Sequence, residues 1–185
     1  VEACIRHAVE LGINNIETAR GYGTSEEQLG HILPTFPRES LLVQSKVAPE
    51  MDVAKFRDNF EKSMRLLRLD YLDIFSMHGI NSEGELEAAM RCMDQARQWL
   101  REGRIREIGF STHGSPALIL KAIKTGAFDH VNLHWYYFYQ DTWKCIEAAR
   151  ARDMGVFIIS PNDKGGMLYR PTEKLIELCA PLHPM

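Results

Sequence analysis

The chain has 185 residues, of which 45% are hydrophobic and 25% charged, and its formal net charge is −3. These values are typical of a globular domain and exclude a disordered, collagen-like or coiled-coil chain. The slight acidic excess gives no broad basic surface, no apolar run approaches the roughly 20 residues that span a bilayer, and residues 1–20 lack a signal-peptide core. We therefore expect a cytoplasmic protein that binds a small molecule, with no nucleic-acid or membrane partner.

The four cysteines lie far apart and form no C-x-x-C pair. Neither a disulfide framework nor a zinc site is indicated, and we predict no metal centre. The chain also begins at Val1 inside a helix-like pattern, so we expect it to be a fragment.

Helix-like and strand-like segments alternate along the chain. Apolar residues at helical spacing, with Ser, Thr or Asp before them and Gly after them, predict helices. The predicted helices span 3–11, 25–33, 52–67, 84–102, 116–124, 141–153 and 172–179. Short apolar runs between the helices predict strands over 13–16, 41–47, 71–77, 105–110, 128–133 and 156–160.

This alternation is typical of an α/β domain whose parallel strands are joined by right-handed crossovers. A doubly wound nucleotide-binding sheet should carry G-x-G-x-x-G after its first strand, and the sequence has no such motif. The other common architecture is the TIM (β/α)8 barrel, which takes about 250 residues. We therefore predict that residues 1–185 form one incomplete barrel domain of six strands, without the first strand and the last unit.

Polar residues cluster where five of these strands end. Barrel enzymes place their chemistry at the carboxyl ends of the strands, so this is where a site is expected. The residues concerned, in chain order, are Glu17 and Tyr22, Lys46, His78, Ser111 and Thr112, and Asn132.

Four of these residues suit proton donation to a carbonyl group. A lysine cation beside a phenol lowers the phenol's pKa, so we expect Lys46 to lower the pKa of Tyr22, the general acid. Glu17 would hold Lys46, and His78 would orient the carbonyl oxygen. Each residue also has an ordinary structural interpretation, such as a solvated carboxylate or a core histidine, but their combination favours catalysis. The hydride must come from a nicotinamide or flavin cofactor, because no side chain supplies one.

The chain resembles the aldo-keto reductases, which are NADP(H)-dependent (β/α)8 barrel enzymes. The resemblance rests on five segments in the family's order: GINNIETARGYGTSEEQLG, LLVQSKV, LDYLDIFSMHG, EGRIREIGFSTHGS and GVFIISP. It implies that Tyr22 is the proton donor, Lys46 its pKa-lowering neighbour and His78 the carbonyl-orienting imidazole. It also implies that Ser111 and Asn132 contact the nicotinamide carboxamide, and that the reaction is the reduction of an aldehyde or ketone to an alcohol.

Four positions depart from the family pattern. Glu17 stands where the family has Asp, Asn132 where Gln is usual, and Thr112 where Asn follows the nicotinamide-contacting Ser. Ile159 replaces an aromatic residue that stacks on the nicotinamide ring. The longer Glu17 leads us to expect reduced or altered activity.

The segment after the last predicted strand resembles a loop that runs along the cofactor pyrophosphate. It adds Ser160, Pro161, Asn162 and Gly165 to the predicted NADP(H) site, although the Gly-Gly pair is equally compatible with a simple turn.

Two alternatives stay open from sequence. The aromatic string Trp135–Tyr139 either lines a pocket for an apolar carbonyl compound or packs a loop. The chain itself is either a reductase or a non-catalytic nicotinamide-nucleotide-binding or regulatory barrel, which Glu17 and Ile159 favour. A catalytic site requires the Tyr22 oxygen within hydrogen-bond reach of Lys46.

Overall fold

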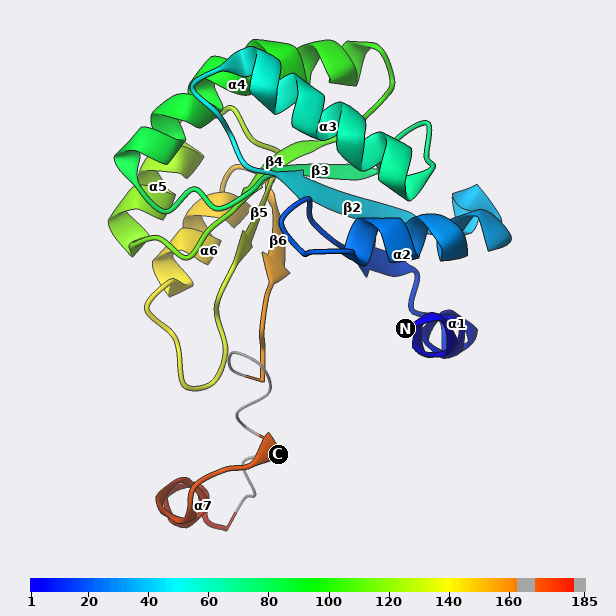
Figure 1. Ribbon diagram of the computed structural model, residues 1–185. Coiled ribbons are helices and arrows are strands. Elements are labelled where there is room, and N and C mark those ends of the chain that lie inside the picture. The colour runs from blue at the N-terminus through cyan, green and yellow to red at the C-terminus, as the bar shows by residue number, and fades with distance from the viewer. Residues whose placement is uncertain (163–168, 182–185) are drawn as a thin grey trace.

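Six parallel strands form the centre of the computed structural model, which describes residues 1–162 and 169–181. The strands pair in chain order, each with the next, and the sheet curls into a half-barrel with helices on its outer side (Figure 1). They are β1 (Asn15–Glu17), β2 (Leu42–Val47), β3 (Ile74–Met77), β4 (Ile108–Ser111), β5 (His130–Leu133) and β6 (Gly155–Ile158). The predicted incomplete (β/α)8-type fold is confirmed.

One helix precedes β1 and another follows each strand. They are α1 (Glu2–Glu10), α2 (Ser25–Ile32), α3 (Val53–Leu67), α4 (Glu83–Arg101), α5 (Pro116–Lys124), α6 (Trp143–Arg150) and α7 (Glu173–Cys179), and two short 3-10 turns, η1 (Leu33–Thr35) and η2 (Arg38–Ser40), follow α2. The side chains of Asp52, Ser82, Ser115 and Thr172 accept a backbone N–H of the first turn, which sets where four of these helices begin.

The predicted elements are present, with shifted boundaries. Five of the six strands begin later than predicted; for β3 and β4 the reason is that Leu72 and Ile105 form only an isolated parallel bridge before the strands start. Glu17 is the last residue of β1 rather than the residue after it, and β6 ends at Ile158, so Ser160 lies outside the strand. The two 3-10 turns were not predicted.

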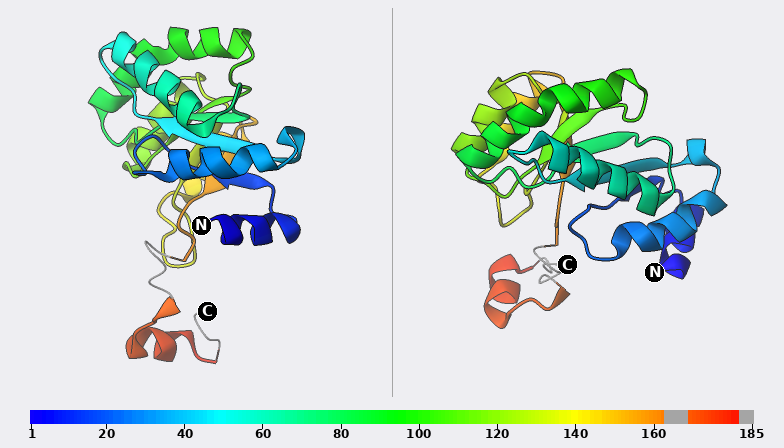
Figure 2. Two further views of the ribbon diagram at one scale, coloured as in Figure 1. Left: turned by 45° about the vertical axis from the view of Figure 1, so that its right-hand side comes forward. Right: turned by 45° about the horizontal axis from the view of Figure 1, so that its top comes forward.

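The core lies between the curled sheet and helices α3 to α6. At its centre, the Trp99 indole of α4 stacks on the Phe60 ring of α3, with ring centroids 3.8 Å apart, and both lie against Phe75 of β3. The elements at the two ends of the chain are less covered. Helices α1 and α7 and strand β6 contain no buried residue, and both helices project from the main body (Figure 2).

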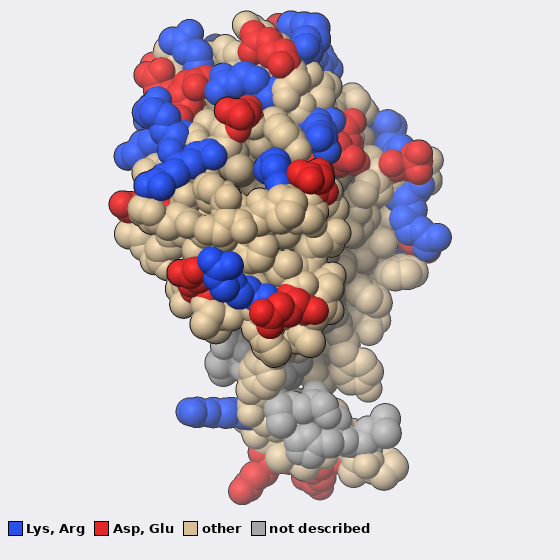
Figure 3. Space-filling model, turned by 90° about the vertical axis from the view of Figure 1, so that its right-hand side faces the viewer, with Lys and Arg blue, Asp and Glu red and all other residues tan. Residues whose placement is uncertain are grey.

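The surface carries charges of both signs. On the face in Figure 3, basic and acidic side chains alternate instead of gathering into a field of one sign. None of the helices that the structure describes is both long and apolar enough to cross a bilayer.

A buried carboxylate ties the strands together at their amino ends. Asp73, just before β3, is 4% exposed and accepts hydrogen bonds from Arg38 Nη2 at 2.6 Å, Arg106 Nη1 at 2.9 Å and the Val43 amide at 3.0 Å. The two guanidinium groups also lie over the ring of Tyr71, 3.9 and 4.4 Å from its centroid. This end of a barrel usually serves stability rather than chemistry.

We predict that Asp73→Asn lowers the free energy of unfolding by about 3 kcal/mol, because it removes the buried charge that pairs with half-buried Arg38 and with Arg106. Urea denaturation measures the change. Asp70→Asn, an exposed substitution of the same kind, should stay within about 0.5 kcal/mol of the starting protein. Equal midpoints for the two variants would contradict the assigned role of Asp73.

Candidate active site

The carboxyl ends of the parallel strands bring the predicted site residues to one edge of the half-barrel. The register pairs Glu17 with Gln44, Lys46 with Ser76 and Ser111 with Asn132. In these strands every second side chain points to the same face. These six side chains therefore all point to the same face of the sheet.

Lys46 and Glu17 form an ion pair at the centre of the site. Lys46 is 1% exposed, and its Nζ donates to Glu17 Oε1 at 2.5 Å and to the Thr18 carbonyl at 2.9 Å. Burial lowers the pKa of Lys46, while the Glu17 carboxylate opposes that shift. A buried ammonium group persists only with such partners, so the predicted pairing is confirmed and has a physical reason.

Tyr22 lies above this pair and is half exposed. Lys46 Nζ is 4.8 Å from the centroid of its ring, and within the described residues no hydrogen bond joins Tyr22 Oη to Lys46. Burial raises the pKa of Tyr22, and the Glu17 carboxylate raises it further. The predicted lowering of this pKa is wrong, because burial and then the Glu17 carboxylate, which both raise it, govern the shift. Tyr22 therefore keeps its proton at neutral pH.

The loop that carries Tyr22 is fixed from both sides. Arg20 forms an ion pair with Glu26 of α2, whose buried carboxylate also accepts a hydrogen bond from Ser45 Oγ at 2.7 Å. Thr18 Oγ1 and Ser25 Oγ lie 2.8 Å apart. Glu26 is not among the residues predicted from sequence, because a glutamate in the first turn of a helix usually has a solvated side chain.

His78, immediately after β3, is half-buried and meets the Tyr22 ring edge-on, with centroids 5.4 Å apart. Burial, assisted by the nearby Lys46 charge, lowers its pKa to about 4. The imidazole is therefore neutral at pH 7, with one N–H to donate and one nitrogen to accept.

The residues predicted to hold the nicotinamide differ in whether their side chains keep a hydrogen-bonding group for a ligand. Ser111 Oγ accepts a hydrogen bond from the Gly79 amide, and no described residue accepts its own proton. Thr112 is buried, donates to the Ile80 carbonyl at 2.6 Å and accepts from the Gly114 amide at 2.9 Å. Ser111 thus fits a ligand contact, whereas the Thr112 side chain is occupied in holding the loop.

Asn132 is also fully buried, and both of its amide protons have partners. They are donated to Glu17 Oε1 at 3.2 Å and to Gln44 Oε1 at 3.4 Å. A nicotinamide carboxamide would therefore have to replace one of these bonds.

The segment after β6 fits a ligand-binding loop in part. Ser160, Pro161 and Asn162 are exposed, and Ser160 has a left-handed φ of 52°, a strained conformation that often marks a binding loop. Asn162 Nδ2 donates to Tyr169 Oη at 2.9 Å. Gly165 lies outside the described residues.

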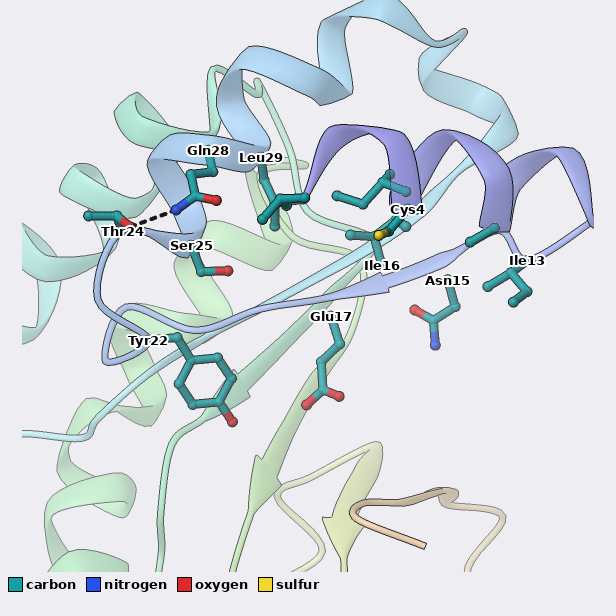
Figure 4. Close-up of a pocket in the computed structure, with 13 residues that line it drawn as sticks. Cys4, Ile13, Asn15, Ile16, Glu17, Tyr22, Thr24, Ser25, Gln28 and Leu29 are labelled. Carbon is teal, nitrogen blue, oxygen red and sulfur yellow. Dashed lines mark hydrogen bonds between the residues drawn. The ribbon is translucent and has the colours of Figure 1, made fainter. Parts of the chain in front are cut away.

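A cavity of about 530 Å³ opens beside the site between α1, β1 and α2 (Figure 4). Cys4, Ile16 and Leu29 line its inner part, and the side chains of Glu17 and Tyr22 point away from α1 at its rim. It therefore reaches two of the four predicted catalytic residues.

The aromatic string is divided between the two expected roles. Tyr136 and Tyr139 bond to each other through their backbones and line a small cavity of about 90 Å³ with His113 and His134. Tyr137 is 75% exposed and belongs to neither the cavity nor the core.

Comparisons with known proteins agree with the fold. The chain is 29% identical over 179 residues to L-galactose dehydrogenase of Arabidopsis thaliana, covering 88% of this chain and 55% of that protein. Among solved structures, the holo form of the aldo-keto reductase AKR11C1 from Bacillus halodurans matches with a TM-score of 0.79 at 20% identity, over 94% of this chain and 61% of that one. An aldo-keto reductase from Klebsiella pneumoniae in complex with NADPH matches with a TM-score of 0.75 at 20% identity, over 96% and 64%.

The chain thus spans 55% to 64% of the length of these relatives. Residues 1–176 match the model of the aldo/keto reductase family, to which this chain belongs.

Proposed function

We propose that the chain forms the proton-donating half of an NADP(H)-dependent oxidoreductase that reduces an aldehyde or ketone to an alcohol, with residues 1–185 as one partial barrel domain. The observation that carries the proposal is the buried Lys46–Glu17 pair beneath Tyr22, beside a neutral His78. The Klebsiella pneumoniae relative bound to NADPH supports the choice of cofactor.

The four side chains have distinct roles in this proposal. The carbonyl oxygen lies between Tyr22 Oη and His78, whose single N–H orients it. Tyr22 donates its proton to that oxygen, and the adjacent Lys46 charge stabilises the phenolate that remains. Glu17 keeps the lysine charged and in place. A bound nicotinamide supplies the hydride, which no side chain provides.

The cofactor would be held by residues at the ends of β4 to β6. Ser111, with its available hydroxyl proton, and the exposed Ser160, Pro161 and Asn162 fit this role. Asn132 would contact the nicotinamide after exchanging one of its hydrogen bonds for a bond to the ligand. Thr112 would contribute by holding the backbone of the loop through its bonds to Ile80 and Gly114. Gly165 remains part of the proposed site.

A second candidate is a non-catalytic nicotinamide-nucleotide-binding barrel. It is favoured by the absence of a Tyr22–Lys46 hydrogen bond within the described residues, and by Ile159 where an aromatic platform is usual. The two candidates differ in turnover but not in cofactor binding.

We predict that Tyr22→Phe and Lys46→Met each lower kcat for carbonyl reduction by about 100-fold or more, because each removes part of the proton donor. NADPH oxidation measures turnover, and quenching of tryptophan fluorescence measures NADPH binding, which should persist in both variants. Tyr71→Phe, at the opposite end of the barrel, should leave kcat unchanged.

Turnover that survives both substitutions would refute the assigned roles. NADPH binding without turnover of any carbonyl compound by the unsubstituted protein would support the binding barrel instead.

We predict that Glu17→Gln lowers the pKa of Tyr22, because the carboxylate charge that raises it is lost while burial remains. The pKa of Lys46 falls as well, since Glu17 is what opposes its desolvation. In a plot of kcat against pH, the fall in kcat at alkaline pH should therefore move to lower pH. NMR of carbon-labelled tyrosine gives the pKa of Tyr22 directly, and Glu27→Gln is the matched surface control.

A further inference from the structure

A continuous chain of side-chain hydrogen bonds runs through the barrel interior beneath the proposed site. Gln44 Nε2 donates to Asn132 Oδ1 at 3.1 Å, and Asn132 Nδ2 donates back to Gln44 Oε1 at 3.4 Å, so the two amides pair reciprocally. At one end Asn132 also donates to Glu17. At the other end Gln44 Nε2 donates to Ser76 Oγ at 2.7 Å, and Ser76 Oγ lies 2.7 Å from His130 Nε2.

The Glu17 end of this chain determines how the amides are oriented. The Glu17 carboxylate accepts hydrogen bonds from Asn132, so Asn132 presents its NH2 group to Glu17 and its oxygen to Gln44. Burial lowers the pKa of His130 to about 4, so the ring is neutral, and its tautomer sets whether Nε2 accepts from Ser76 or donates to it. Ser76 Oγ accepts from Gln44 with either tautomer, because a hydroxyl oxygen can accept two hydrogen bonds.

The local packing is built around His130. A Cβ at Gly109 would lie 2.2 Å from His130 Nε2, and a Cβ at Gly155 would lie 3.2 Å from His130 Cβ. The imidazole thus occupies the space over a glycine of the neighbouring strand, which holds the ring rigidly against Ser76. Gln44, Ser76 and His130 are all buried, with at most 1% of each exposed.

We propose that Gln44 is a positioning residue that acts through Asn132 to hold the Glu17 carboxylate against Lys46. The inference rests on the proposed function, since it concerns the geometry of that site. Glu17 is one-third exposed and lies on the edge strand β1, so Lys46 alone would leave it able to swing toward solvent. The paired amides supply the second fixed contact to the same oxygen, Oε1.

Gln44→Leu tests the proposal, because it removes the two hydrogen bonds to Asn132 and the one to Ser76 while keeping a side chain of similar volume. We expect kcat to fall about 10- to 100-fold, since the substitution misplaces a catalytic group. In a Glu17→Asp background the carboxylate is too short to reach Asn132, so adding Gln44→Leu should change kcat less than about twofold. Equal fold-losses in both backgrounds would show a merely structural role and overturn the proposal.

A second readout needs neither cofactor nor turnover. The Glu17 carboxylate raises the pKa of Tyr22, so NMR of labelled tyrosine reports where that carboxylate lies. We expect a lower Tyr22 pKa in Gln44→Leu, and no further change when Gln44→Leu is added to Glu17→Gln. A Tyr22 pKa that is unchanged or higher in Gln44→Leu would overturn the proposal even if the protein reduces no carbonyl compound.

Gln98→Leu, on the exposed face of α4, is the matched control and should alter neither readout. If Gln44→Leu fails to fold, Gln44→Met removes the same hydrogen bonds with an unbranched side chain that adapts to the cavity.

Discussion

The buried ammonium group of Lys46 is the constraint around which this site is organised. A cation removed from water inside a parallel sheet is stable only where the chain provides compensating oxygens. The end of β1 provides them, as the Glu17 carboxylate and the Thr18 carbonyl. The register of β1 on β2 and the tethered loop that follows β1 both place these oxygens. The contacts that compensate the Lys46 charge therefore also place Tyr22 over the lysine.

The architecture could be predicted from sequence because each element repeats the same pattern. Apolar runs of strand length, glycine stops and Ser or Asp caps recur along the chain, and the parallel fold follows from their alternation. The rule that barrel chemistry lies at the carboxyl ends then selected Glu17, Lys46 and His78. Exact strand starts were harder, because Leu72 and Ile105 have strand-like side chains but make only one bridge.

The electrostatics of the site could not be predicted in the same way. A lysine near a tyrosine lowers its pKa only if its charge outweighs burial and nearby carboxylates, and sequence does not show that balance. Here the ammonium group lies over the ring, and burial, aided by the Glu17 carboxylate, raises the pKa of Tyr22 instead. The interior hydrogen-bond chain did leave a signal in the sequence. Polar pairs two residues apart lie in β2, at the end of β3 and in β5, namely Gln44 and Lys46, Ser76 and His78, and His130 and Asn132.

The fit of the His130 ring over Gly109 has a consequence for how this sequence can vary. The space beside position 109 of β4 is already filled by the His130 ring of β5, so only one of these two strands can place a side chain there. Any side chain gained at position 109 requires a smaller residue at position 130, and with that change Ser76 loses its hydrogen-bond partner on β5. Positions 109 and 130 are therefore expected to diverge together or not at all, which would leave a correlated pair in an alignment of related barrels.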